Sequence, residues 1–283
     1  MKEVMSCLVA GCLAGAGCGE SVAPEPLCDA SNQTAGRVGM EARTVVERLA
    51  IGEAVLFDNG GPYVFVDGKC NYWVSNPSQM FAETHTGTLD AETAIELGSR
   101  LHFNAWEDLS GDWSDPYGGT FDAPILIFDN SRNAVVCRDH CDASEVPSAV
   151  KAMRDAMIRI AQELWDDGAP APSSLRVVAT PAEAGPGIPF VDWPLVRPFS
   201  DFVRTGDVGF GEGTLEEDVE SVRVLKELRR SFLDGEHGAF VWGMLPVKSG
   251  GAYYNLYIRD TLPFEDASGL VPLTGQVANI QRR

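Results

Sequence analysis

Basic residues and histidines are scarce in this chain. It has 22 lysines and arginines against 41 aspartates and glutamates, a formal net charge of −19, and only four histidines. A surface with this charge repels nucleic-acid phosphates and disfavours contact with anionic lipid head groups. We therefore expect no nucleic-acid partner. The acidity agrees with attraction of cations or with the simple solubility of a surface protein.

The familiar catalytic signatures are also missing. The sequence contains no G-x-S-x-G elbow, phosphate-binding loop, dinucleotide fingerprint or H-E-x-x-H motif. The histidines lie in unrelated segments, and we interpret each as solvated or structural: His85, His102, His140 and His237. The sequence thus predicts no catalytic residue, no metal ligand and no cofactor.

The N-terminal apolar stretch is too short to span a bilayer, which needs about twenty residues. Lys2 precedes a run from Val4 to Gly17 that is apolar or small except for Ser6. A charged start followed by a short apolar run is typical of an export signal. We therefore predict a signal peptide over 1–17 and a polar tether over 18–36. A cytoplasmic chain with a chance apolar start is the alternative.

The end of this signal resembles that of bacterial lipoproteins, in which small residues directly precede a lipidated cysteine. Gly15-Ala16-Gly17-Cys18 matches that pattern loosely, whereas Val9-Ala10-Gly11-Cys12 matches it better by residue type. The resemblance implies a lipid on Cys18, or on Cys12, and a membrane partner through that anchor. Ala14-Gly15-Ala16 could instead be an ordinary cleavage site that yields a secreted protein.

The seven cysteines support export. Cleavage before Cys18 would leave four in the folded part, which allow three pairings. We favour Cys137–Cys141, because a five-residue segment leaving a strand can bring its ends within bridging distance. Cys28–Cys70 then remains. A zinc site of Cys137, His140 and Cys141 is the weaker alternative, since no second ligand pair has a supporting spacing.

Hydrophobic periodicity predicts an α+β fold, with antiparallel hairpins and sheets packed against two long amphipathic helices. The long helices are expected over 144–167 and 214–233, the second opened by a capping box at Thr214–Glu217. A shorter helix is expected over 90–102, with Asp90 as its N-cap. Strands are expected over 53–57, 63–66, 70–74, 83–88, 125–128, 134–137, 175–179, 239–247 and 253–259.

A Pro- and Ser-containing segment over 169–174 is interpreted as a linker. It separates an α+β domain over 37–170 from residues 171–283, which form either a second α+β domain or a continuation of the first. The oligomeric state is not indicated by the sequence.

A loop is expected over 106–122, and its segment Gly111–Asp122 is the best candidate for a ligand site. Asp112, Trp113, Asp115 and Tyr117 combine rings with carboxylates, which suit a sugar or a cation. The alternative is a turn-rich loop whose aromatic residues cap the core. Asp112, Asp115 and Asp122 could also form an acid/base couple of a glycan hydrolase. The Asp129–Asn133 turn lacks the glycine and distal glutamate of a calcium-binding loop, so a plain hairpin is expected.

Longer segments resemble uncharacterised exported proteins of the myxobacterial type. They are Tyr63–Val74, His85–Asp90 and Leu256–Phe264. The resemblance implies a location and no activity. We therefore predict an envelope lipoprotein, anchored at the outer membrane or secreted, that binds a glycan, a cation or a protein without catalysis. An extracytoplasmic carboxylate-dependent hydrolase acting on glycan is the alternative.

Overall fold

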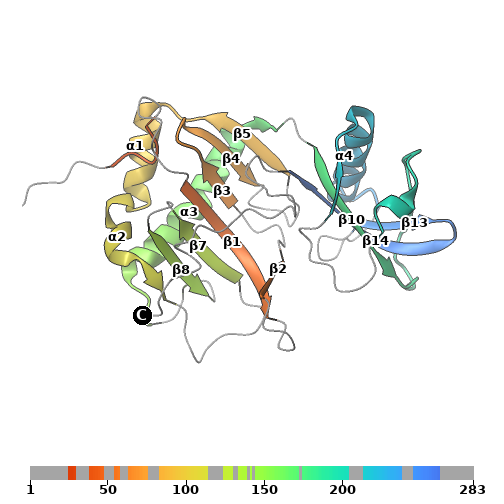
Figure 1. The fold of residues 1–283 in the computed structure, drawn as a ribbon, viewed down its shortest axis with the longest axis horizontal. Helices are drawn as coiled ribbons and strands as arrows, with labels where there is room; N and C mark the ends of the chain where they lie inside the picture. Colours follow the sequence, from red (N-terminus) through yellow and green to blue (C-terminus); the bar gives the residue numbers. More distant parts are fainter. Residues whose placement is uncertain are drawn as a thin grey trace, which may run out of the picture.

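The chain folds as a mixed α/β protein with two largely antiparallel sheets (Figure 1). The fold class expected from the sequence is therefore confirmed at this level. The computed structural model describes residues 25–29, 38–47, 54–57, 63–75, 83–113, 124–129, 133–138, 141, 144–171, 174–203, 213–237 and 245–261.

The large sheet is built around one long strand. Strand β1 (Val38–Glu47) pairs antiparallel with β2 (Ala54–Phe57), β3 (Tyr63–Val66) and β7 (Pro124–Asp129). Across the sheet the strand order is β6-β8-β7-β1-β3-β4-β5-β9, and β2 pairs with β1 outside this path. The remaining strands are β4 (Asn71–Ser75), β5 (Thr84–Thr88), β6 (Gly111–Asp112), β8 (Ala134–Arg138) and β9 (Ala169–Pro170).

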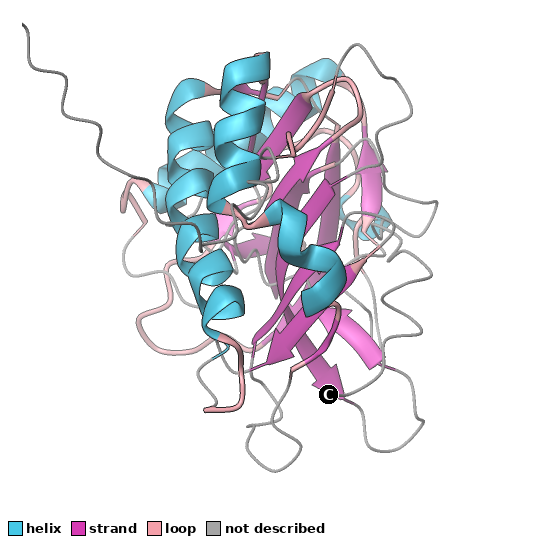
Figure 2. Cartoon of the chain, turned by 90° about the vertical axis from the view of Figure 1, so that its left-hand side faces the viewer, coloured by secondary structure: helices cyan, strands magenta, loops and turns pink. Residues whose placement is uncertain are grey.

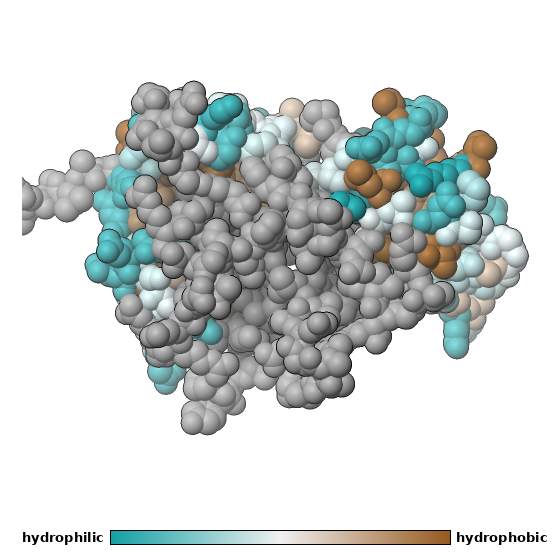
Figure 3. Space-filling view, in the orientation of Figure 1, coloured by the Kyte–Doolittle hydropathy of each residue, from teal (hydrophilic) through white to brown (hydrophobic). Residues whose placement is uncertain are grey.

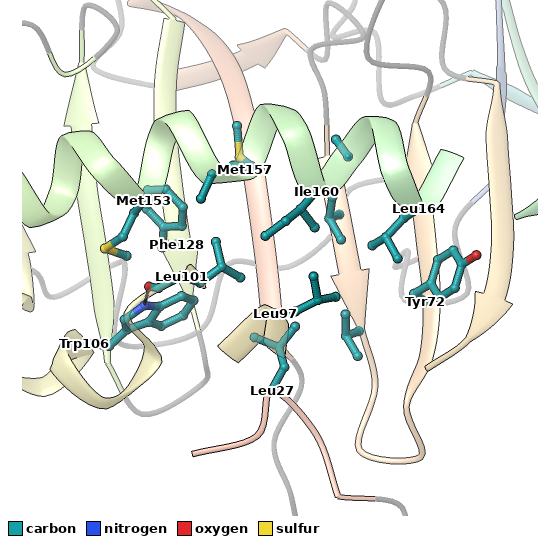
Figure 4. Close-up of a cluster of buried hydrophobic side chains, with 14 of the residues drawn as sticks. Leu27, Tyr72, Leu97, Leu101, Trp106, Phe128, Met153, Met157, Ile160 and Leu164 are labelled. Carbon is teal, nitrogen blue, oxygen red and sulfur yellow. Dashed lines mark hydrogen bonds between the residues drawn. The ribbon is translucent and has the colours of Figure 1, made fainter. Parts of the chain in front are cut away.

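Helices cover one face of the large sheet (Figure 2). They are α1 (Ala91–Arg100), α2 (Trp106–Leu109) and α3 (Ser148–Asp167). Apolar side chains of α3 point toward α1 and α2 (Figure 4), and the fully buried Trp106 donates its indole N–H to the Leu101 carbonyl at 2.8 Å. We call the buried apolar cluster between these helices and the large sheet the first core; it includes Leu97, Leu101, Trp106, Phe128, Met153 and Ile160. Burial of such side chains supplies its main stabilisation.

Local sequence explains how α1 begins. The Asp90 carboxylate accepts a hydrogen bond from the backbone N–H of Thr93, the usual role of an N-cap residue. That hydrogen bond lowers the pKa of Asp90. An N-cap at Asp90 was expected from the sequence, and the structure confirms it.

The small sheet has the order β11-β13-β14-β10-β12. Its strands are β10 (Leu175–Ala182), β11 (Val191–Asp192), β12 (Thr214–Glu216), β13 (Leu245–Ser249) and β14 (Ala252–Asp260). Helix α4 (Val219–Leu233) lies beside β10 and β14 (Figure 1) and buries Leu225, Leu228 and Phe232. These residues join Phe199, Phe202 and the apolar face of the sheet in the second core.

A buried carboxylate connects the two cores. Asp260, at the end of β14, is 1% exposed, and its Oδ2 accepts a hydrogen bond of 2.8 Å from the backbone N–H of Thr84 in β5. Its Oδ1 lies 3.4 Å from the guanidinium of Arg229, which is 2% exposed, and 3.5 Å from Nζ of Lys226. Lys226 also donates to the Ala171 carbonyl. We call Asp260, Arg229, Lys226 and Thr84 the junction cluster.

Both expected disulfides are present. The Cα atoms of Cys28 and Cys70 are 5.4 Å apart, and those of Cys137 and Cys141 are 5.3 Å apart. All four cysteines are buried. Together the bridges indicate an oxidising, extracytoplasmic location. Among the described residues, no helix combines the length and the apolarity needed to cross a membrane.

The sequence misplaced several boundaries. Thr214–Glu216 is a strand, and α4 begins at Val219 with Asp218 as its N-cap, so the predicted capping box is wrong. The competing reason is that the backbone of Thr214–Glu216 pairs with β10, and the Thr214 hydroxyl donates to the Asp201 carbonyl at 2.9 Å instead of capping a helix. Likewise α3 begins at Ser148, and Trp106–Leu109 is helical, not part of a loop.

Two segments differ from their sequence-based interpretation. Strand β1 was not expected, although it is central to the large sheet. Within the expected tether, Leu27 is 2% exposed and its N–H donates to the Ala94 carbonyl of α1. The close approach leaves no room for a side chain at Gly98. Residues 1–24, and with them Cys12 and Cys18, lie outside the described residues.

We expect Asp260→Ala to lower the free energy of unfolding by about 3–5 kcal/mol, because it leaves the buried Arg229 without its carboxylate. Urea denaturation followed by fluorescence would measure the loss. Arg223→Ala, on the exposed side of α4, is the control and should change stability little. A loss below about 1 kcal/mol for Asp260→Ala would show that the junction cluster contributes little to the stability of the fold.

The two disulfides should contribute unequally. Chain entropy predicts that Cys28→Ser/Cys70→Ser, which opens a loop with a sequence separation of 42, costs about 4 kcal/mol. The pair Cys137→Ser/Cys141→Ser, with a separation of 4, should cost about 2 kcal/mol. Denaturant midpoints of the two double variants would test this. The reverse order would contradict the entropic account.

Candidate functional site

The predicted ligand loop is only partly described. Asp112 ends β6, and Trp113 follows it directly. The backbone N–H of Trp113 donates to the Val136 carbonyl at 2.8 Å, and its indole N–H donates to the Leu109 carbonyl at 2.9 Å. The ring packs against the first core. Trp113 is therefore engaged within the fold, whereas Asp115, Tyr117 and Asp122 lie outside the described residues.

The cysteine cluster near this loop does not have the chemistry of a zinc site. Cys137 and Cys141 are joined in a disulfide and are both 0% exposed, so neither offers a thiolate. Within the described part of the chain, no group of three or more histidine, cysteine or acidic side chains is arranged to hold a metal. His140 lies outside that part. Of the predicted Asp129–Asn133 turn, residues 130–132 lie outside the described residues; β7 and β8 on either side of it pair antiparallel, with Asp129 opposite Ala134.

Two histidines make contacts within the fold. His85 stacks on Trp165 with ring centroids 3.6 Å apart and donates from Nδ1 to the Trp165 carbonyl at 2.8 Å. Nε2 of His237 lies 3.0 Å from Oγ of Ser231, which suggests a nucleophile pair at first sight. However, that hydroxyl donates to the Leu228 carbonyl at 2.7 Å, as serines in helices commonly do. The Ser231 hydroxyl proton is therefore used in a hydrogen bond to the helix backbone and is not directed at His237.

The small sheet has two chemically different faces. Because side chains alternate along a strand, every second residue of β14 faces α4, while the others face away. The residues facing α4 include Leu256 and Ile258, which are buried. We call the opposite side the outer face. Its described residues, matched by strand register, are Asp192, Lys248, Tyr253, Ala182, Pro246, Asn255, Thr180, Tyr257, Val178, Arg259, Arg176 and Leu215.

One row of the outer face is exposed and carries polar and aromatic groups together. Asp192, Lys248 and Tyr253 are direct cross-strand neighbours on β11, β13 and β14. Nζ of Lys248 lies 3.4 Å from the Asp192 carboxylate, and the two side chains are 44% and 85% exposed. Tyr253 is 37% exposed, and its ring contacts that of Phe190 with centroids 4.6 Å apart. We call Asp192, Lys248, Tyr253 and Phe190 the distal row.

The rest of the outer face leads from the distal row toward the junction cluster. Asn255 and Tyr257 follow Tyr253 at alternate positions of β14 and are half-buried. Burial raises the pKa of Tyr257, so its hydroxyl stays protonated at neutral pH and can donate a hydrogen bond. The space-filling view shows the small-sheet part of the molecule with hydrophilic and apolar residues intermixed at its surface (Figure 3).

Sequence reasoning did not single out this face. The pattern over 253–259 did predict the strand, and the structure pairs it antiparallel with β13, which precedes it along the chain. What the pattern could not give is the neighbour of each residue. Asp192 precedes Lys248 by 56 positions and reaches it through a short parallel pairing that has no sequence signature.

Comparison of the chain with protein-family models, with curated proteins and with solved structures found no match.

We expect Trp113→Ala to destabilise the protein by about 2–3 kcal/mol, because it removes a ring packed on the first core and a hydrogen bond. Thermal unfolding would measure the loss, and Glu107→Gln, at an exposed position of α2, is the control with little expected effect. Full stability of Trp113→Ala, together with loss of ligand binding, would instead restore the ligand-site interpretation of this loop.

Proposed function

We propose that this protein is an exported binding protein of the bacterial cell envelope, held at the membrane by a lipid on Cys18 and without catalytic activity of its own. The observation that carries the proposal is the pair of buried disulfides. Reducing conditions in the cytoplasm keep thiols free, whereas buried bridges persist in an oxidising compartment. The acidic surface, with a net charge of −19, agrees with a soluble body outside the cell.

The position of the N-terminal segment decides which end of the molecule an anchor at Cys18 would hold. Glu25 and Leu27 lie beside α1, at the opposite end of the molecule from the β13–β14 hairpin (Figure 1). Glu25 lies seven positions after Cys18, and even a fully extended chain spans at most about 25 Å over that distance. A lipid at Cys18 would therefore keep the large-sheet end near the membrane and direct the hairpin away from it.

The distal row supports a binding role. It lies at the end of the molecule that the anchor would present to the surroundings, and it offers a ring, a carboxylate and an ammonium group on neighbouring strands. Rigid strands hold these groups in place without a loop that must become ordered on binding, which favours recognition.

Cell fractionation with thiol trapping tests the proposal. In native material, Cys28, Cys70, Cys137 and Cys141 should resist alkylation until a reductant is added, because they are bridged. The mature chain should begin at Cys18 with acyl chains detectable by intact-mass measurement. Cys18→Ser should move the protein out of the membrane fraction.

Cys12→Ser is the matched control, and it should leave the acylated mass and the membrane association unchanged. If Cys12→Ser releases the protein while Cys18→Ser does not, the anchor is at Cys12. A chain that keeps Met1 and has four freely alkylated thiols would overturn the proposal.

A further inference from the structure

We propose that the distal row is a binding site for a neutral, hydroxyl-rich glycan. This inference rests on the proposed binding function and names both the site and the class of ligand. It places the site on the small sheet, away from the loop over 106–122 that the sequence favoured.

The geometry of the row argues for a small extended ligand. Three neighbouring strands contribute Asp192, Lys248 and Tyr253, and two strand spacings amount to about 10 Å. This length accommodates a few linked sugar rings. A stable protein partner would need well over about 1,000 Å² of buried surface, whereas the row offers one exposed ring and one ion pair.

The ring of Tyr253 provides the apolar contact. It is exposed, and the ring of Phe190 packs against it at 58° between the ring planes, which restricts its movement. Sugar rings have a C–H face that packs on an aromatic face, and a restrained ring loses little conformational freedom on binding.

Charge complementarity argues for a neutral ligand. The Asp192 carboxylate and the Lys248 ammonium group neutralise each other at 3.4 Å, although the chain as a whole carries −19. The carboxylate accepts hydrogen bonds and the ammonium group donates them, so the pair matches hydroxyl groups, which do both. An anionic or cationic polymer would be attracted by one member of the pair and repelled by the other.

The experiment uses the mature chain with both disulfides intact. Isothermal titration is performed with neutral hexasaccharides of glucose (α- and β-linked), mannose and N-acetylglucosamine. At least one should bind in the micromolar-to-millimolar range. Tyr253→Ala should weaken that binding at least about tenfold, which corresponds to about 1.4 kcal/mol. Tyr253→Phe, which keeps the ring, should retain affinity within about threefold.

Two further variants separate the polar contribution. Asp192→Ala and Lys248→Ala should each weaken binding, whereas Ile158→Ala, an exposed apolar site on α3, should not. Unchanged urea midpoints would show that the variants remain folded. Absence of binding for all four hexasaccharides, or equal binding by Tyr253→Ala and the wild type, would overturn this inference. The export proposal would stand in that case, because it is tested by thiol trapping and acylation.

Discussion

The burial of Asp260 is the constraint on which the arrangement of the two sheets depends. A carboxylate removed from water is unfavourable unless its oxygens are satisfied, and the groups that satisfy it come from both cores. Thr84 belongs to the large sheet, whereas Arg229 and Lys226 belong to α4. Separating the cores would leave the Thr84 N–H without its acceptor and would expose the Asp260–Arg229 ion pair at the end of β14. The junction cluster therefore couples the two sheets more firmly than a short connecting segment would.

The same cluster orients the outer face. Asp260 ends β14, and Tyr253 lies seven residues earlier on the same strand, about 24 Å away along its axis. Fixing one end of β14 against β5 thus directs the other end, with β13 and β11 beside it, away from the large sheet. The Cys28–Cys70 bridge and the contact of Leu27 with α1 fix the N-terminal segment at the opposite end. These two attachments therefore place the N-terminal segment and the β13–β14 hairpin at opposite ends of the molecule.

Local patterns in the sequence were sufficient for most hairpins, for the N-cap at Asp90 and for both disulfides. They failed where distant residues decide the local structure. Thr214–Glu217 has the composition of a helix start, but residues 214–216 pair with β10, and the Thr214 hydroxyl donates to the distant Asp201 carbonyl. Strand β1 lacks turn signals that would delimit it, and its pairing with β7 links segments about 85 residues apart along the chain. A short stretch of sequence shows neither of these long-range pairings.

The candidate sites show the same contrast between composition and position. Asp112 and Trp113 attracted attention because rings and carboxylates were adjacent in the sequence, yet the indole N–H of Trp113 is used by the Leu109 carbonyl. Asp192, Lys248 and Tyr253 are dispersed in the sequence and become neighbours only through strand register. A binding surface on a sheet is assembled across strands, because residues adjacent in sequence point to opposite faces. Sequence proximity is therefore a weak guide to such a surface, and register is the decisive information.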